Sequence, residues 1–427
     1  MTTETAIDTG LLRLSTVGSV DDGKSTLVGR LLFDTKSLFA DTIEAVERAS
    51  VGRGNGALDL SLVTDGLRAE REQGITIDVA YRYFATPRRK FVLADCPGHV
   101  QYTRNTVTGA STADVVVVLV DARHGILEQT KRHLAIAALM RVQHVVLTVN
   151  KFDLVDWDER VFRRIETEFL LLGRALGIRD VTAIPVSALL GDNIAAPSTH
   201  VPWYSGPTLL DFLESVEVLE QQGEFRFPVQ TVILPRTGSH RDYRGYAGQI
   251  TGGRIAVGDR VIVHPAGIES VVTGIDTYDG ALAEAIAPQS VVLRLQHDID
   301  VTRGDLLAKA SSEVTAREEL LGTVCWLAER PLKPGRRVYV RIGTALVRAI
   351  VEDLVDGFDI DSFEPVPVAQ LELNDIGRVR IRLAVPVAYD TYEDSRRTGS
   401  FALIDEQSGD VLGAGLVAAA LGGNWTI

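Results

Sequence analysis

One short glycine-rich run has the residue types and spacing of a phosphate-binding loop. The run follows a predicted strand over residues 11–17 and opens a predicted helix over 25–32. Glycines let the backbone curl so that its N–H groups point at phosphate oxygens, and a lysine can bridge the β- and γ-phosphates. An accidental glycine-rich turn is the alternative, which the strand–helix placement disfavours. The pattern GxxxxGK followed by Ser or Thr predicts nucleotide contacts from Gly18, Ser19, Val20, Asp21, Asp22, Gly23, Lys24, Ser25 and Thr26.

Two later loops carry residues suited to recognising guanine. An Asn-Lys-Phe-Asp tetrad follows the predicted strand 145–149. The Asp153 carboxylate can accept hydrogen bonds from the N1–H and exocyclic amine of guanine, which adenine does not offer. Asn150 can secure the loop and the base, and the Lys151 stem can lie over the ring. A tetrad alone can be a plain strand-end turn, but a further loop after the predicted strand 182–186 supplies a backbone N–H for the guanine oxygen: Ser187, Ala188 and Leu189.

Two more loops are placed to sense the γ-phosphate. Asp95, after the predicted strand 91–94, can hold the water shell of Mg²⁺, and the Gly98 N–H can contact the γ-phosphate. Loss of that phosphate would then move the following helix. Thr76, in a Gly-Ile-Thr run, can reach both Mg²⁺ and the γ-phosphate. The predicted metal ligands are Ser25, Thr76 and Asp95.

A histidine stands directly after the phosphate-sensing glycine. His99 can orient the attacking water, because phosphoryl transfer mainly needs positioning and charge neutralisation. A solitary histidine is more often structural, and both interpretations stay open. Val20 and Ile75 would flank it, either as a gate or as simple apolar filling. The predicted catalytic residues are Lys24, Thr76 and His99.

The sequence predicts one α/β domain followed by two β-barrels. In the first half, short apolar runs alternate with stretches of helical spacing, over residues 127–140 and 157–176 for example, which predicts a mostly parallel sheet with helices on both faces. Runs at 78–84 and 90–94 predict a hairpin and one antiparallel strand. From residue 225 onward, short β-rich runs alternate with turn residues, as in small antiparallel barrels. We predict domains over 1–222, 223–312 and 313–427.

Composition excludes several classes of protein. The 427 residues are 45% hydrophobic and 24% charged with a net charge of −13, which is typical of a globular protein and weighs against broad nucleic-acid or membrane binding. Two cysteines, Cys96 and Cys325, are too few for a disulfide framework, and no secretory or membrane-spanning pattern is visible. We therefore expect a cytoplasmic protein with both cysteines buried. The basic run at 88–90 is expected to be a solvated hairpin turn.

These motifs together resemble the translation-factor GTPases, elongation factor Tu and its relatives. The shared features are an Asp-Cys-Pro-Gly-His run at 95–99, the Gly-Ile-Thr run, and the order of an α/β domain and two barrels. The run at 246–255 resembles the second-domain pattern of that superfamily. The resemblance implies GTP and Mg²⁺ as cofactors.

A more specific resemblance covers nearly the whole chain. The second aspartate of the phosphate loop (Asp22) and the runs at 65–84, 101–105, 202–207 and 298–305 are similar to the large, GTPase subunit of bacterial sulfate adenylyltransferase (ATP sulfurylase). That family implies an enzyme that makes adenosine 5′-phosphosulfate and pyrophosphate from ATP and sulfate. A separate small subunit binds ATP and sulfate and transfers the adenylyl group, while GTP hydrolysis on the large subunit drives the unfavourable synthesis.

The sequence also departs from that family in places. Phe152 replaces the commoner methionine of the tetrad, which we expect to be tolerated because this side chain points into the fold. The pair at 105–106 differs from the usual Asn-Met, and residues 417–427 match no pattern. Some relatives carry a fused adenylylsulfate kinase, which we do not expect here because no second phosphate loop is present.

Two other functions remain open from the sequence. The first is a translation factor that binds aminoacyl-tRNA, and the second is a regulatory GTPase without a catalytic partner. Residues 313–427 carry 12 basic and 18 acidic side chains. A tRNA-binding barrel should be rich in basic residues, so this balance disfavours the translation factor.

Overall fold

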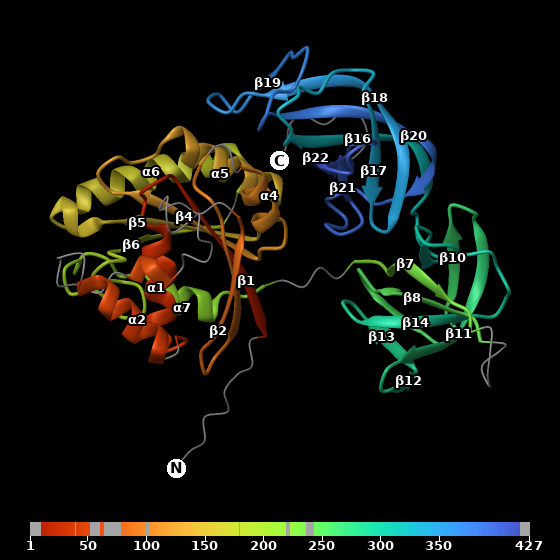
Figure 1. Ribbon diagram of the computed structural model, residues 1–427, viewed down its shortest axis with the longest axis horizontal. Coiled ribbons are helices and arrows are strands. Elements are labelled where there is room, and N and C mark those ends of the chain that lie inside the picture. Colours follow the sequence, from red (N-terminus) through yellow and green to blue (C-terminus); the bar gives the residue numbers. More distant parts are fainter. Residues whose placement is uncertain are drawn as a thin grey trace. The chain divides into compact units, whose positions relative to one another are not determined.

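The computed structural model describes residues 10–38, 40–51, 60–63, 78–99, 103–178, 180–218, 223–235 and 243–418. These residues form two compact units (Figure 1). The first consists mainly of the N-terminal half and includes Asp359–Glu364, and the second contains the remaining β-rich half. Each unit is described by itself.

A six-stranded sheet forms the centre of the first unit, in the order β2-β3-β1-β4-β5-β6. β1, β3, β4, β5 and β6 run parallel, and β2 is antiparallel to β3, which confirms the predicted hairpin. Every residue of β4 is buried, as an apolar run in a sheet covered on both faces should be. The strands are β1 (Leu11–Gly18), β2 (Ala80–Ala85), β3 (Lys90–Asp95), β4 (Val115–Asp121), β5 (His144–Asn150) and β6 (Val181–Pro185).

Helices pack on both faces of this sheet (Figure 1). Leu27 and Leu31 of α1 share one hydrophobic core with Leu209 and Leu213 of α7. α5 adjoins both α4 and α6. The helices are α1 (Lys24–Asp34), α2 (Ala40–Val51), α4 (Thr103–Ser111), α5 (Glu128–Leu139), α6 (Glu159–Ala175) and α7 (Leu209–Ser215), with short 3₁₀ turns η1 (Leu60–Val63) and η3 (Phe152–Val155).

Two antiparallel barrels form the second unit. The first closes in the order β10-β15-β7-β8-β14-β11 through pairing of β10 with β11, and the second closes in the order β17-β21-β22-β16-β20-β18 through pairing of β17 with β18. The predicted fold class is therefore confirmed, while the exact domain boundaries stay predictions. The first barrel consists of β7 (Arg226–Ile233), β8 (Gly245–Gln249), β10 (Arg260–His264), β11 (Ile268–Thr277), β14 (Ser290–Leu295) and β15 (Leu306–Lys309).

Four short strands lie outside the barrel rings. They are β9 (Arg254–Ala256), β12 (Gly280–Leu282), β13 (Glu284–Ile286) and β19 (Pro365–Val366). β12 pairs with β11, β19 pairs with β18, and β9 and β13 form a separate two-stranded sheet. The second barrel itself consists of β16 (Ala316–Trp326), β17 (Arg337–Ile342), β18 (Ala345–Phe358), β20 (Ile376–Ala388), β21 (Ser400–Ile404) and β22 (Val411–Val417).

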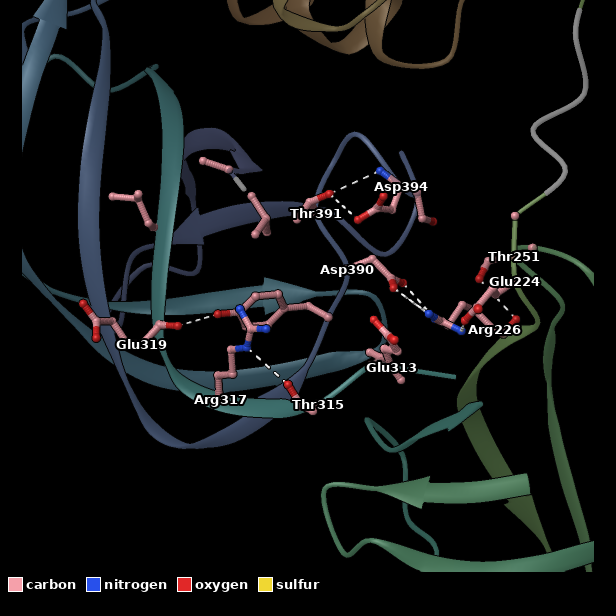
Figure 2. Close-up of a pocket in the computed structure, with 18 of the residues that line it drawn as sticks. Glu224, Arg226, Thr251, Glu313, Thr315, Arg317, Glu319, Asp390, Thr391 and Asp394 are labelled. Carbon is pink, nitrogen blue, oxygen red and sulfur yellow. Dashed lines mark hydrogen bonds and ion pairs between the residues drawn. The ribbon is translucent and has the colours of Figure 1, made fainter. Parts of the chain in front are cut away.

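A buried ion pair joins the two barrels. The Arg226 guanidinium donates to both oxygens of Asp390, with Nη2 at 2.8 Å from Oδ1 and Nε at 3.0 Å from Oδ2. The Thr398 hydroxyl also donates to Asp390. Figure 2 shows this pair beside a cavity lined by residues of both barrels. The cavity has a volume of about 1350 Å³. The pair thus fixes the first strand of one barrel to a loop of the other.

Arg89 corrects the prediction of a solvated turn at 88–90. Its side chain is buried, and Nη1 donates to the carbonyl oxygens of Leu213 at 2.9 Å and Val216 at 2.6 Å. Carbonyls at the end of a helix lack intrahelical partners, so the α7 terminus offers a cation two acceptors. Arg88 remains exposed, 3.3 Å from Glu214. Cys96 and Cys325 are buried, as predicted.

Within the described part of the chain, every helix is too short or too polar to traverse a bilayer.

Candidate functional site

The predicted nucleotide contacts that the structure describes gather at one edge of the sheet. The phosphate loop joins β1 to α1, Asp95 ends β3, and Asn150 ends β5. The loop beginning at Ser187 follows β6. Carboxyl ends of parallel strands are the usual place for ligands in such sheets. Thr76 and Ile75 lie outside the described residues, so their predicted roles stay predictions.

Lys24 lies at the centre of the phosphate loop. Its ammonium donates to the carbonyl oxygens of Gly18 at 2.8 Å and Ser19 at 2.9 Å, and the residue is 8% exposed. Burial lowers the pKa of Lys24, while the nearby carboxylates of Asp95 and Asp22 oppose that shift. The loop therefore holds a cation where the helix N-terminus already favours phosphate.

Gly98 approaches the same ammonium from the end of β3. A Cβ atom at this position would collide with Lys24 Nζ and lie 2.8 Å from the Gly18 carbonyl oxygen. Only glycine lets the backbone come this close to the phosphate loop. His99 follows directly and is half-buried. The structure thus brings the predicted γ-phosphate sensor and the phosphate loop together, although they lie far apart in the sequence.

Asp22, the second aspartate of the loop, acts inside the loop itself. Its carboxylate accepts a hydrogen bond of 2.6 Å from the Ser19 N–H, and the residue is 3% exposed. Burial raises the pKa of Asp22, whereas this backbone hydrogen bond and Lys24 lower it. The side chain therefore braces the turn of the loop and satisfies one of its backbone N–H groups.

Asn150 ties three loops together. Its Nδ2 donates to the Asp22 carbonyl oxygen at 2.7 Å, and its Oδ1 accepts from the Ala188 N–H at 3.0 Å. Lys151 adopts a left-handed φ of 57° and donates to the Asp21 carbonyl oxygen. The predicted tetrad, phosphate loop and Ser-Ala-Leu loop therefore form one hydrogen-bonded arrangement.

Two side chains of this arrangement were not predicted. Asp121, at the end of β4, lies 3.1 Å from Lys151 Nζ and also accepts from the Arg123 backbone and side chain at 3.0 Å. Burial alone would raise the pKa of Asp121, but the bonds from Arg123 and Lys151 hold it well below its usual value. Arg30 of α1 donates to the carbonyl oxygens of Ala188 at 3.2 Å and Leu189 at 2.6 Å.

The oxygen donors beside Lys24 fit a magnesium ion. Asp95 is 2% exposed and accepts from the Thr16 hydroxyl at 3.0 Å, and Ser25 lies in the first turn of α1. Mg²⁺ prefers hard oxygen ligands and usually combines one or two protein groups with phosphate oxygens and waters. A carboxylate and a hydroxyl beside a phosphate loop suit that preference.

The fold and this edge of the sheet define a GTPase of the translation-factor type. In agreement, the family described as "Elongation factor Tu GTP binding domain" matches residues 10–222, and the "GTP-eEF1A C-terminal domain-like" family matches residues 319–418. GTP binding is the property that the first family name states.

Whole-chain relatives identify the particular family. "Sulfate adenylyltransferase subunit 1" of Erwinia tasmaniensis is 47% identical over 416 residues, which cover 96% of this chain and 87% of that protein. The protein of the same name from Colwellia psychrerythraea is 44% identical, and the match covers 88% of that protein. "Bifunctional enzyme CysN/CysC" of Mycobacterium tuberculosis is 50% identical over 96% of this chain and 67% of its own length. The chain belongs to the sulfate adenylyltransferase subunit 1 family, which confirms the resemblance predicted from its sequence.

Proposed function

We propose that this chain is the GTPase subunit of a sulfate adenylyltransferase. GTP hydrolysis on it would drive the formation of adenosine 5′-phosphosulfate and pyrophosphate from ATP and sulfate. The observation that carries the proposal is the identity of 44–50% to named members of the family over 96% of the chain. The same similarity favours this function over the delivery of aminoacyl-tRNA.

The arrangement at the sheet edge supports the following residue roles. Lys24 neutralises the β- and γ-phosphates, and Asp153 accepts hydrogen bonds from the guanine edge. Ser25 and Asp95, with Thr76, would hold Mg²⁺, and the ion would supply charge neutralisation at the phosphates. His99 orients the attacking water. The Ser187–Leu189 backbone faces the guanine oxygen. The contacts of Lys24, Asn150 and Gly98 support these roles.

A second, small subunit completes the proposed enzyme in the cytoplasm. It would bind ATP and sulfate and transfer the adenylyl group, while this chain couples GTP hydrolysis to that step. The "subunit 1" in the relatives' name supports a partner subunit. GTP hydrolysis can drive the synthesis only if the two active sites communicate, so each substrate set should change the rate at the other site.

The test measures GTP hydrolysis by this chain together with the small subunit. We expect hydrolysis to speed up when ATP and sulfate are both added, and the Lys24→Ala variant to lose GTP binding and the GTP-driven gain in synthesis. The chain without the small subunit is the control. No stimulation, combined with tight and salt-sensitive tRNA binding, would instead assign the chain to translation.

A further inference from the structure

Residues 200–210 form a segment that packs against the proposed guanine-binding loops. The segment contains the Pro-Trp-Tyr-Ser-Gly-Pro run at 202–207 and leads directly into α7. None of the roles above uses it. Its contacts reach both the tetrad loop and the loop after β6.

Aromatic packing joins this segment to the tetrad loop. Phe152, between Lys151 and Asp153 in the sequence, is fully buried, and its ring meets that of Trp203 edge to face with centroids 6.0 Å apart. Five residues further along the loop, Trp157 stacks on His200 with centroids 4.9 Å apart and planes within 12°. Two ring pairs therefore hold the loop that carries the proposed base-reading carboxylate.

Backbone hydrogen bonds join the same segment to the loop after β6. The Leu209 N–H donates to the Asn193 carbonyl oxygen at 2.9 Å, and the Leu210 N–H donates to that of Ile194 at 2.8 Å. Asn193 in turn donates from Nδ2 to the Pro185 carbonyl oxygen at 2.9 Å, at the end of β6. One segment thus supports both loops that would read the base.

Trp203 has little freedom to move within this packing. The Arg163 guanidinium of α6 lies over its ring at 5.6 Å and over the Phe162 ring at 5.4 Å. The neighbouring Tyr204 hydroxyl bonds to the carbonyl oxygens of Ala183 at 3.2 Å and Pro207 at 3.0 Å. An aromatic ring fixed on both sides gives Phe152 a rigid surface to pack against.

We propose that Trp203 is a positioning residue for guanine recognition, acting through Phe152 on Asp153. This inference rests on the proposed guanine site. Phe152 and Asp153 are consecutive residues of the single 3₁₀ turn η3. A shift of the Phe152 ring therefore tilts that turn and moves the Asp153 carboxylate away from the exocyclic amine of the base.

The test compares the binding of GTP and inosine triphosphate, which lacks the exocyclic amine. Trp203→Ala should raise the Kd for GTP about tenfold and the Kd for inosine triphosphate less. Only GTP has the exocyclic amine whose hydrogen bond to the Asp153 carboxylate is weakened. The KM for GTP should rise with kcat unchanged. Trp203→Phe, which keeps a ring against Phe152, should restore most of the preference. Asp153→Asn removes the proposed base-reading carboxylate itself, so it sets the largest loss of preference for GTP that the assay can show.

Phe91→Ala is the matched control for loss of a buried ring. Phe91 is 1% exposed and stacks on Phe84 at 4.5 Å, on the far strands of the same sheet. This variant should lose stability while keeping the ratio of the two Kd values. If wild-type protein shows no preference for GTP, the proposed guanine site itself is wrong. If wild type prefers GTP and Trp203→Ala keeps the full preference, Trp203 has no positioning role.

A surface variant covers the case in which Trp203→Ala does not fold. His200 is exposed, so His200→Ala removes its stacking on Trp157 without opening the core. We expect a two- to threefold smaller preference for GTP over inosine triphosphate with the Tm nearly unchanged. Trp157 also packs edge to face on Phe152 with centroids 5.9 Å apart, so an unchanged preference in this variant would overturn positioning through Phe152.

Discussion

The Lys151 ammonium lies 3.1 Å from the Asp121 carboxylate, between the ends of two neighbouring strands. β4 and β5 pair in parallel register, with Asp121 opposite Asn150. Asp121 is 2% exposed, so its charge is poorly screened by solvent. The carboxylate and the Asp21 carbonyl oxygen together fix the lysine that we expect to lie over the base.

Asp121→Asn should weaken GTP binding without slowing the chemical step. The amide keeps the shape of the side chain but removes the charge that holds Lys151, and loss of a charge-assisted hydrogen bond predicts a Kd about tenfold higher. Titration with a fluorescent GTP analogue and hydrolysis at saturating GTP separate the two effects. Asp156→Asn is the control, since Asp156 is an exposed aspartate that lies close to Lys151 in the sequence. Equal weakening in both variants would rule out a specific role of the Lys151 contact.

His99→Ala should slow hydrolysis while leaving GTP affinity within about twofold of wild type. Phosphoryl transfer depends mainly on positioning, and misplacing a reacting group by about 1 Å can cost a factor of about 10² in rate. The place of His99 after Gly98, which abuts the phosphate loop, supports a role in positioning the attacking water. Single-turnover measurements with prebound GTP report the hydrolysis step directly. Turnover at the wild-type rate would assign the histidine to structure.

Much of the proposed nucleotide site was predictable because each of its loops is a short contiguous motif. The phosphate loop and the tetrad each need only a few neighbouring side chains at the end of an apolar strand. The carboxyl ends of parallel strands lie at one edge of the sheet, so the fold class predicts that the loops following them come together. The burial of Phe152, between the two residues proposed to read the base, was also predicted correctly.

The residues that were missed act across the fold rather than along the chain. Arg30 contacts carbonyls more than 150 positions away, and this depends on how α1 packs beside the loop after β6. Arg89 was placed wrongly because a basic run in a hairpin turn is usually solvated, whereas here the end of α7 supplies buried acceptors. No local pattern encodes either contact.

Asp390→Ala should strongly destabilise the two-barrel unit. Arg226 and Asp390 have side chains that are each 8% exposed, so removing the carboxylate leaves a buried charge without its main partner. Such losses typically lower the free energy of unfolding by about 3–5 kcal/mol. Urea unfolding followed through the fluorescence of the buried Trp326, in a protein whose other three tryptophans are replaced by phenylalanine, reports on this unit.

Glu284→Ala is the control for the loss of an ion pair in the same unit. Its partner Arg254 is 72% exposed and Glu284 is 45% exposed, so we expect a change of at most about 1 kcal/mol. A similar loss of stability in both variants would show that burial of the Arg226 pair is not what stabilises the junction.

His133 should make the first unit less stable as the pH falls. This residue of α5 is 1% exposed, and burial, followed by the charges of Lys24 and Arg132, lowers the pKa of its imidazole to about 3. The ordinary value in an unfolded chain is about 6.5. Between these two values the unfolded state binds a proton that the folded state does not. Stability is therefore complete above about pH 6.5 and falls by up to about 1.4 kcal/mol per pH unit below it.

His133→Gln should remove this dependence. Glutamine cannot bind the proton, and it retains an amide that can contact Gln129, whose Nε2 lies 3.1 Å from His133 Nε2. We expect the stability advantage of wild type over the variant to shrink by about 2 kcal/mol between pH 7 and pH 5, because the unfolded wild type alone gains a proton there. Denaturant unfolding of both proteins across this range measures the difference. Parallel stability curves would mean that His133 titrates alike in the folded and unfolded chain, and that burial beside Lys24 does not exclude its proton.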